Sequence, residues 1–373
     1  MDTTNSEERT HGDPLVMFYP PYQDELLSSW IIRNSIVQGS DPMGWIYGFW
    51  GEWRAWTRDI DRFLPKMRTI ELARFSRLAL NDIYNMTLSP IIARIEGEIP
   101  PVNTAWRWVI PTGRRNRSIV GGLQFCPQCL NEKGCFFPRL WRLSWHTQCP
   151  VHHIQLHEKC ERCAMPFSPH LIDYTTPFVH LCPRCGKDLR QSKTVTAYQD
   201  LLHLQQTLDT LFLSSYYNPY LQWDLHTRET LFLFLRDLLT LAVIISRKRD
   251  RYAQWQMFLF GKTRFDKLSS RAGMTFDMRS IEERSSLLLI ALHLLKHNPD
   301  YLLKSLYHIH ITQAILNDQH FPLSIIMQHT LSRLPPPKVI RQIQTRSTTN
   351  PASKEPRTAT EIKEEMRKIR KYL

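Results

Sequence analysis

The sequence of 373 residues has no long apolar run. Its longest apolar stretches, Leu238–Ile245 and Leu287–Leu295, are interrupted by Thr240 and His293 and fall well short of the roughly 20 residues that span a bilayer as a helix. The first residues, beginning Met1-Asp-Thr-Thr, are polar and acidic and lack the apolar core of an export signal. We therefore expect no membrane span, and we expect the thiols to lie in the reducing cytoplasm.

Sequence motifs that mark several kinds of enzyme are also missing. There is no Gly-rich loop followed by Lys and Ser or Thr, as in nucleotide hydrolases, and no nucleophile elbow. The combination of His-x-Glu and Pro-Cys-x-x-Cys found in zinc deaminases is absent too. We therefore assign no catalytic residue and expect no enzymatic activity. A two-metal nuclease remains a minor alternative, because its acidic residues need not be neighbours in the chain.

What the chain does contain is a series of cysteine pairs. Four pairs of ligands, each with two intervening residues, stand within residues 126–185. Such a pair can bend onto one tetrahedral metal ion, and eight ligands are what two structural zinc ions require, with no position left for a reactive water. A disulfide framework is the weaker interpretation, since such frameworks belong to secreted chains. The predicted zinc ligands are Cys126, Cys129, Cys149, His152, Cys160, Cys163, Cys182 and Cys185.

The four pairs can share two ions in two ways. In the sequential form the first two pairs hold one zinc ion and the last two hold the other, as in tandem zinc ribbons. In the cross-braced form alternate pairs share an ion, as in a RING domain. The segment between His152 and Cys160 is longer than the about two or three residues usual in a RING, so we favour the sequential form. His153 is a rival to His152 as a ligand, and the spacing favours His152, while Cys135 lies outside both sites.

The composition is basic, with a formal net charge of +13 and an isoelectric point of about 9.4. Seven metal-bound thiolates and two divalent ions would lower the charge to about +10. A basic balance favours phosphate-rich partners. Two short runs are candidates for contacts with nucleic acid, although a solvated loop is an equally good interpretation of the second. The first run is Arg114, Arg115 and Arg117, and the second is Arg247, Lys248 and Arg249.

The residues before the cysteine pairs predict a helical domain, residues 15–118. Gln23–Ile36 has apolar side chains at helical spacing and is followed by a Gly-Ser-Asp-Pro break. Arg68–Leu88 has the rhythm of a helix-turn-helix, with Arg77 at the place where the tight turn often has glycine. An ordinary helical hairpin fits this segment as well as a DNA-reading motif does.

The residues after the cysteine pairs predict a second helical domain, residues 193–334. Apolar side chains recur there at spacings of three and four in four segments, the pattern of helices in a bundle. These segments are Leu201–Phe212, Leu231–Ser246, Ile281–Lys296 and Tyr301–Leu316. Residues 335–373 predict a flexible basic tail, in which Thr358 and Glu361 form a capping-box pattern ahead of a last helix.

The predicted fold class is mainly α with small zinc-ribbon β elements. Residues 1–14 are expected to be a flexible N-terminus, and residues 119–192 the tandem zinc ribbons between the two helical domains.

Five short segments together resemble a known family. The segments are Pro21–Arg33, Arg58–Arg62, Phe125–Leu130, Trp141-Arg142 and Cys149–Leu156. Over roughly residues 15–190 they are similar, in order and spacing, to the TniQ/TnsD family of transposon target-selection proteins, with a weaker resemblance in Ile281–Leu316. This resemblance implies an N-terminal helix-turn-helix domain, tandem zinc ribbons with sequential ligation and a helical C-terminal domain.

The resemblance also implies a function in recruitment, in the bacterial cytoplasm and at the nucleoid. Members of the family bind attachment-site DNA or dock on an RNA-guided CRISPR effector, and then engage the AAA+ regulator TnsC, which brings the transposase. Both modes of targeting, and a homodimer, are compatible with the sequence. The alternatives are a zinc-ribbon DNA-binding regulator outside transposition and, with less weight, a RING-like ligase or nuclease.

Overall fold

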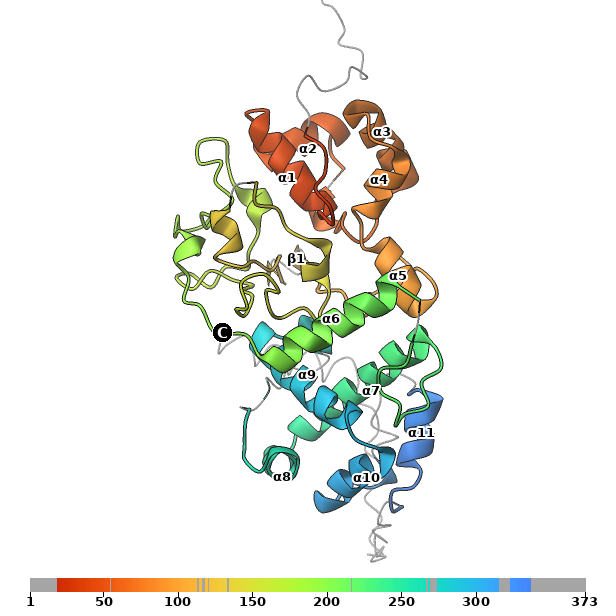
Figure 1. Cartoon of the computed structure of the whole chain (residues 1–373). Helices are drawn as coiled ribbons and strands as arrows, with labels where there is room; N and C mark the ends of the chain where they lie inside the picture. Colours follow the sequence, from red (N-terminus) through yellow and green to blue (C-terminus); the bar gives the residue numbers. More distant parts are fainter. Residues whose placement is uncertain are drawn as a thin grey trace, which may run out of the picture. The chain divides into compact units, whose positions relative to one another are not determined.

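Helices form most of the regular structure of the described residues (Figure 1). The computed structural model describes residues 19–336 except 54, 113, 116–117, 120, 133, 216, 266–267, 269–273 and 315–322, with the backbone alone for 114–115 and 118–119. The described residues all belong to one compact unit. Arg117, the N-terminal 14 residues and the predicted tail helix lie outside the described residues.

The N-terminal helices pack around a tryptophan-rich core. Trp30, Trp45 and Trp50 are buried together in this core. Asp41 caps α2 by accepting a hydrogen bond from the Gly44 N–H at 2.6 Å, and the proline at the first position of the helix needs no hydrogen-bond partner for its nitrogen. The elements of this region are α1 (Leu27–Val37), α2 (Pro42–Trp50), the short 3-10 helix η1 (Ala55–Thr57), α3 (Lys66–Ser76), α4 (Leu80–Asn85) and α5 (Ser89–Glu96).

The predicted helix-turn-helix segment contains α3 and α4, which contact each other across a short turn. Leu72 of α3 and Ile83 of α4 are buried, in line with the predicted pattern. Arg77 ends α3 in the left-handed conformation, with φ 59° and ψ 17°. An L residue other than glycine adopts this conformation at a cost in free energy. The turn therefore exists without the expected glycine, and a DNA-reading role for the pair remains a prediction.

The segment with the cysteine pairs consists of loops, 3-10 turns and isolated β-bridges. Among the described residues the only regular strands are β1 (Arg114–Arg115) and β2 (Ser118–Ile119), which pair antiparallel. Isolated antiparallel bridges, such as the one between Phe125 and His157, hold the loops together. The mainly α fold class with small β elements is confirmed. The 3-10 turns are η2 (Cys129–Asn131), η3 (Arg139–Arg142), η4 (Pro169–Leu171) and η5 (Leu189–Gln191).

The C-terminal helices pack around α7, which contacts α5, α8, α9 and α11. Three predicted segments coincide closely with α6, α7 and α9, whereas the fourth predicted helix ends at His308 instead of Leu316. No helix among the described residues is long and apolar enough to cross a membrane. The elements are α6 (Gln199–Leu213), α7 (Arg228–Ser246), α8 (Arg249–Phe260), η6 (Phe276–Met278), α9 (Ile281–Leu295), α10 (Pro299–His308) and α11 (Ile325–Leu331).

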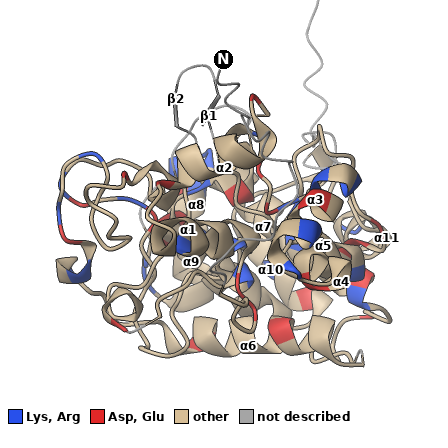
Figure 2. Ribbon diagram, turned by 90° about the horizontal axis from the view of Figure 1, so that it is seen from above, with Lys and Arg blue, Asp and Glu red and all other residues tan. Residues whose placement is uncertain are grey.

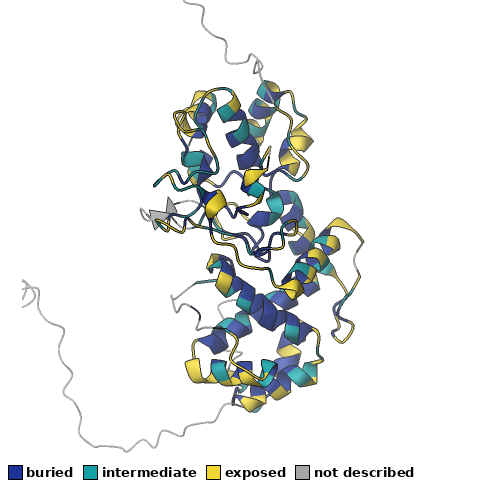
Figure 3. Cartoon of the chain, turned by 60° about the vertical axis from the view of Figure 1, so that its left-hand side comes forward, coloured by how far each residue is buried: buried dark blue, intermediate teal, exposed yellow. Residues whose placement is uncertain are grey.

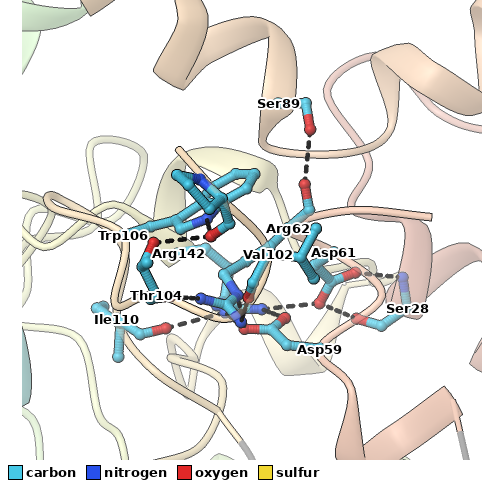
Figure 4. Close-up of polar contacts among 11 residues, drawn as sticks. Ser28, Asp59, Asp61, Arg62, Ser89, Val102, Thr104, Trp106, Ile110 and Arg142 are labelled. Carbon is cyan, nitrogen blue, oxygen red and sulfur yellow. Dashed lines mark hydrogen bonds and ion pairs between the residues drawn. The ribbon is translucent and has the colours of Figure 1, made fainter. Parts of the chain in front are cut away.

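A buried ionic network joins the N-terminal helices to the ribbon segment (Figure 4). Arg142, at the end of η3, donates hydrogen bonds to the carboxylates of Asp59 and Asp61, each at 2.8 Å. Asp61 in turn accepts hydrogen bonds from the N–H and the hydroxyl of Ser28 in α1, at 2.7 and 2.8 Å. Burial raises the pKa of Asp61 to about 6, against the opposing effect of Arg142. The network therefore ties three separate stretches of the chain together.

A second set of buried polar contacts joins the ribbon segment to the C-terminal helices, whose inner faces are buried in Figure 3. Arg284 of α9 is buried and donates to the Ser144 carbonyl at 2.7 Å and to Gln124 Oε1 at 2.9 Å. Gln205 of α6 accepts hydrogen bonds from two successive backbone N–H groups, those of Thr147 and Gln148, both at 2.9 Å. The ribbon segment is therefore fixed by specific hydrogen bonds to α6 and α9 as well as by apolar packing.

Candidate metal centres and basic segments

The first cluster brings together Cys126, Cys129, Cys149 and His152, whose ligand atoms all lie within 4.8 Å of one another. The sulfurs of Cys129 and Cys149 are 3.7 Å apart, and Nδ1 of His152 lies 3.2 Å from the Cys129 sulfur. Two sulfurs bound at about 2.3 Å to one tetrahedral zinc ion would be about 3.8 Å apart. The spacing of the donor atoms therefore fits a tetrahedral metal ion, with His152 offering Nδ1.

The second cluster brings together Cys160, Cys163, Cys182 and Cys185, again within 4.8 Å. The Cys160 and Cys185 sulfurs are 3.7 Å apart, and those of Cys163 and Cys182 are 3.6 Å apart. These distances match the same tetrahedral edge. The structure thus groups the predicted ligands in sequential order, as two separate sets of four.

Three of the four pairs share one backbone turn. The residue after the second ligand, His153, Ala164 or Gly186, has a positive φ of 50°, 55° or 67°. Its N–H donates to the carbonyl of the first ligand, for example from Ala164 to Cys160 at 2.9 Å. His153 is exposed and occupies this turn position, so the structure brings His152 rather than its rival into the cluster.

Local hydrogen bonds prepare individual thiols for metal. Hydrogen bonds from Cys126 and Cys129 lower the pKa of Cys149 to about 2. In the second cluster, the backbone N–H of Lys187 lowers the pKa of Cys185 to about 7. The hydrogen bond with Cys126 raises the pKa of Cys129, and burial raises the pKa of Cys182 to about 12. The thiolate that binds metal therefore forms readily at Cys149 and Cys185 but not at these two.

A carboxylate that the sequence analysis missed supports the first cluster. The other ring nitrogen of His152, Nε2, lies 3.1 Å from Glu132 Oε1. A carboxylate at this place fixes the orientation and tautomer of a ligating imidazole. The only signal in the sequence was an acidic residue soon after the first cysteine pair, which is too common to be diagnostic.

Cys135 behaves differently from the other seven cysteines. It belongs to neither cluster, and burial raises its pKa to about 12, with a further contribution from Glu132. The Cys135 thiol therefore stays protonated at neutral pH and is a poor metal ligand.

The two predicted basic runs lie in different elements. Arg114 and Arg115 form β1, and their side chains are outside the description. Arg247 and Lys248 connect α7 to α8, while Arg249 is the first residue of α8, and all three are exposed. Figure 2 shows basic and acidic residues interspersed over the helices. Binding of nucleic acid by either run remains a prediction.

These features define a helical protein with two closed Cys/His clusters in the segment between its helices. The donor sets are three thiolates with one imidazole and four thiolates, a chemistry that suits a structural zinc ion.

The family model described as TniQ matches residues 16–156. This region begins before α1 and ends just after the first cluster, so this part of the chain is similar to the TniQ family. A search of curated proteins gave no match. Asp59, Asp61 and Arg142, which belong to the segments that carry the resemblance, are the residues of the buried network in Figure 4.

Proposed function

We propose that the chain is a target-selection adaptor of transposition. The observation that carries this proposal is the TniQ match, which covers the N-terminal helices, the first cluster and the buried network between them. In this role the chain binds a target and recruits the AAA+ regulator TnsC and, through it, the transposase. Its place of action is the bacterial cytoplasm, at the nucleoid.

The clusters in this proposal hold two structural zinc ions. All four donors of each cluster come from the protein, so a bound ion has no open position for a substrate or a reactive water. The zinc ions would supply folding free energy to a segment that has few regular elements of its own. The chain then has no turnover, and its activity is binding.

The target is DNA or an RNA-guided CRISPR effector with its guide RNA. The net charge of +13 supports a phosphate-rich target in both cases. Direct contacts would come from Arg114, Arg115 and Arg117, or from the connection between α7 and α8. We keep residues 15–118, 119–192 and 193–334 as the three proposed domains, and a homodimer as a proposed assembly.

The experiment that tests the proposal is capture of TnsC, from the same mobile element, on immobilised target DNA or on the CRISPR effector. The chain should retain TnsC on the target, without ATP hydrolysis or nicking of its own. Because coupling between two ligands is reciprocal, TnsC should tighten target binding by the same factor. The Cys135→Ser variant, which keeps both clusters, is the matched control and should behave as the parent chain.

If TnsC neither binds the chain nor changes its affinity for the target, the adaptor proposal is wrong. A zinc-ribbon DNA-binding regulator outside transposition would then be the better description.

A further inference from the structure

The second cluster has an arginine at the same place in both of its cysteine pairs. Arg162 directly precedes the ligand Cys163, and Arg184 directly precedes Cys185. In the first cluster the corresponding places are occupied by Gln128 and Val151, which carry no charge. Only the second cluster therefore presents a pair of cations next to its metal ligands.

The backbone that carries the two arginines is held in the same way on both sides. In each pair the turn closes with an N–H to carbonyl hydrogen bond of 2.9 Å, from Ala164 to Cys160 and from Gly186 to Cys182. The four sulfurs lie within 4.8 Å of one another, so one metal ion would fix both turns. Each guanidinium is then attached to a rigid turn, and little backbone entropy is lost when it binds a ligand.

Neither arginine pairs with another residue in the part of the chain that the structure describes. Arg162 and Arg184 are exposed, and within the described part of the chain no ion pair or hydrogen bond of either guanidinium is found. The neighbouring acid Glu161 is 3.6 Å from the Lys187 amine, and it also accepts the Lys193 backbone N–H at 2.7 Å. The acids beside the arginines are thus engaged elsewhere.

A second acid near the cluster is engaged as well. Asp188 is paired with Arg190 at 2.8 Å. Lys159 and Lys193, on either side of the cluster, are exposed cations. An anion that approaches the second cluster therefore meets two exposed guanidiniums for which the described residues supply no acidic partner.

We propose that Arg162 and Arg184 contact backbone phosphates of a nucleic acid. The planar guanidinium donates two parallel hydrogen bonds to phosphate oxygens and stays charged at every physiological pH. This inference rests on the proposed function, because it identifies a surface that holds the target. DNA and RNA share the phosphodiester chemistry, so the same pair serves a DNA-directed or an RNA-guided adaptor.

One competing explanation comes from the metal site itself. A zinc ion with four thiolates carries a net charge of −2, and two nearby arginines would reduce the cost of that charge. In that case the arginines act on zinc affinity and make no contact with nucleic acid. The test must therefore measure the zinc content of each variant together with its binding to nucleic acid.

The test compares the parent chain with the Arg162→Gln/Arg184→Gln variant, both loaded with zinc. Binding to a labelled DNA duplex of mixed sequence, and to a labelled single-stranded RNA, is measured by anisotropy across a range of salt concentrations. Loss of two phosphate contacts should lower the slope of log affinity against log salt by about 2 units for the polymer that is bound. The conservative variant Arg162→Lys/Arg184→Lys should keep the slope within about half a unit.

The matched control is Lys296→Gln/Lys304→Gln, which removes the same charge from exposed positions at the end of α9 and in α10. It should change the slope by less than about half a unit. An unchanged slope in the arginine variant, or no measurable binding of either polymer by the parent chain, overturns the inference. A loss of zinc with an unchanged slope identifies the charge-balancing role, and weaker binding to polyglutamate with an unchanged slope identifies an acidic protein partner.

Failure of this inference is distinguishable from failure of the proposed function. If the slope falls but TnsC is not recruited, the phosphate contact stands and the adaptor proposal is wrong. If TnsC is recruited to the target and the slope is unchanged, the adaptor proposal stands without this surface.

Discussion

At the scale of single residues, Arg77 and Asp61 both occupy states that cost free energy. Arg77 has a left-handed backbone at the end of α3, and its side chain is exposed. Asp61 is a buried carboxyl whose pKa is raised by desolvation. The cost at Arg77 can be removed by substitution without loss of a buried contact. The cost at Asp61 depends on pH.

Replacing Arg77 with glycine should stabilise the folded chain. Glycine adopts φ 59° without a Cβ clash, and this gain exceeds its larger entropy in the unfolded state, so we expect about 0.5 to 1 kcal/mol. The measurement is the midpoint of urea unfolding followed by tryptophan fluorescence. The control Arg74→Gly lies inside α3 and should destabilise by about 1 kcal/mol. Destabilisation by Arg77→Gly would mean that the guanidinium makes a contact that stabilises the fold.

The contribution of Asp61 to stability should increase as the pH falls. Its folded-state pKa of about 6 lies above the ordinary 3.8, so the folded chain takes up a proton that the unfolded chain does not. This stabilisation is present at low pH and is lost as the pH rises through 6. Relative to that of the Asp61→Asn variant, the free energy of unfolding of the parent should increase by about 1 kcal/mol when the pH falls from about 7.5 to about 5.5.

Unfolding midpoints of the parent and the Asp61→Asn variant over this pH range check the prediction. Asp82→Asn, at an exposed position in α4, is the control and should give a constant difference from the parent. If the difference in stability between the parent and Asp61→Asn were also constant, it would show that Arg142 keeps Asp61 ionised over the whole pH range.

At the scale of elements, the cysteine turns were predictable and their surroundings were not. Two ligands with two residues between them must bend toward each other if both bind one metal ion, so the spacing predicted the ligands, and three of the four pairs form the same turn. Glu132 supports His152 from a position that no spacing rule marks. Helix α8 was missed because its basic start reads as a connection, whereas Tyr252, Trp255 and Leu259 form its buried face.

Removal of one ligand should cost one metal ion. Cys160→Ser leaves three donors in the second cluster, and we expect zinc content to fall from two ions per chain to one, with a lower melting temperature. Cys135→Ser, outside both clusters, should keep both ions. Elemental analysis and a thermal melt provide the two readings. A Cys160→Ser protein with both ions and an unchanged melt would contradict the structural role.

At the scale of the whole molecule, the described parts are joined by contacts between residues distant in sequence. Asp59 and Arg142 are separated by 83 positions, and Gln124 and Arg284 by 160. Periodicity and motif spacing operate over short distances, so they predicted helices and ligands but not these joints. Asp59, Asp61 and Arg142 lie in two of the segments that carry the resemblance, and the structure shows that they pair in a buried network.

Loss of Arg284 should destabilise the chain far more than loss of a surface arginine. Arg284→Leu would leave the Ser144 carbonyl and Gln124 Oε1 without a buried donor, so we expect a loss of about 3 kcal/mol. Arg333→Leu removes an exposed pair with Asp300 and should cost less than about 1 kcal/mol. Urea unfolding measures both. Equal effects of the two substitutions would show that α9 holds the ribbon segment by apolar packing alone.

The hydrogen bonds from Gln205 and Arg284 to the ribbon segment also restrict how such proteins can exchange parts during evolution. A recombination crossover just before α6 would transfer the C-terminal helices into another chain. The backbone carbonyls and N–H groups that Arg284 and Gln205 bind in the parent ribbon segment would not be transferred with them. In a chimera, the hydrogen bonds between the helices and the ribbon segment form only if the new helices carry a guanidinium and a side-chain amide at matching positions. Compatibility between parental sequences would therefore depend on these buried donors and acceptors as well as on the apolar packing around them.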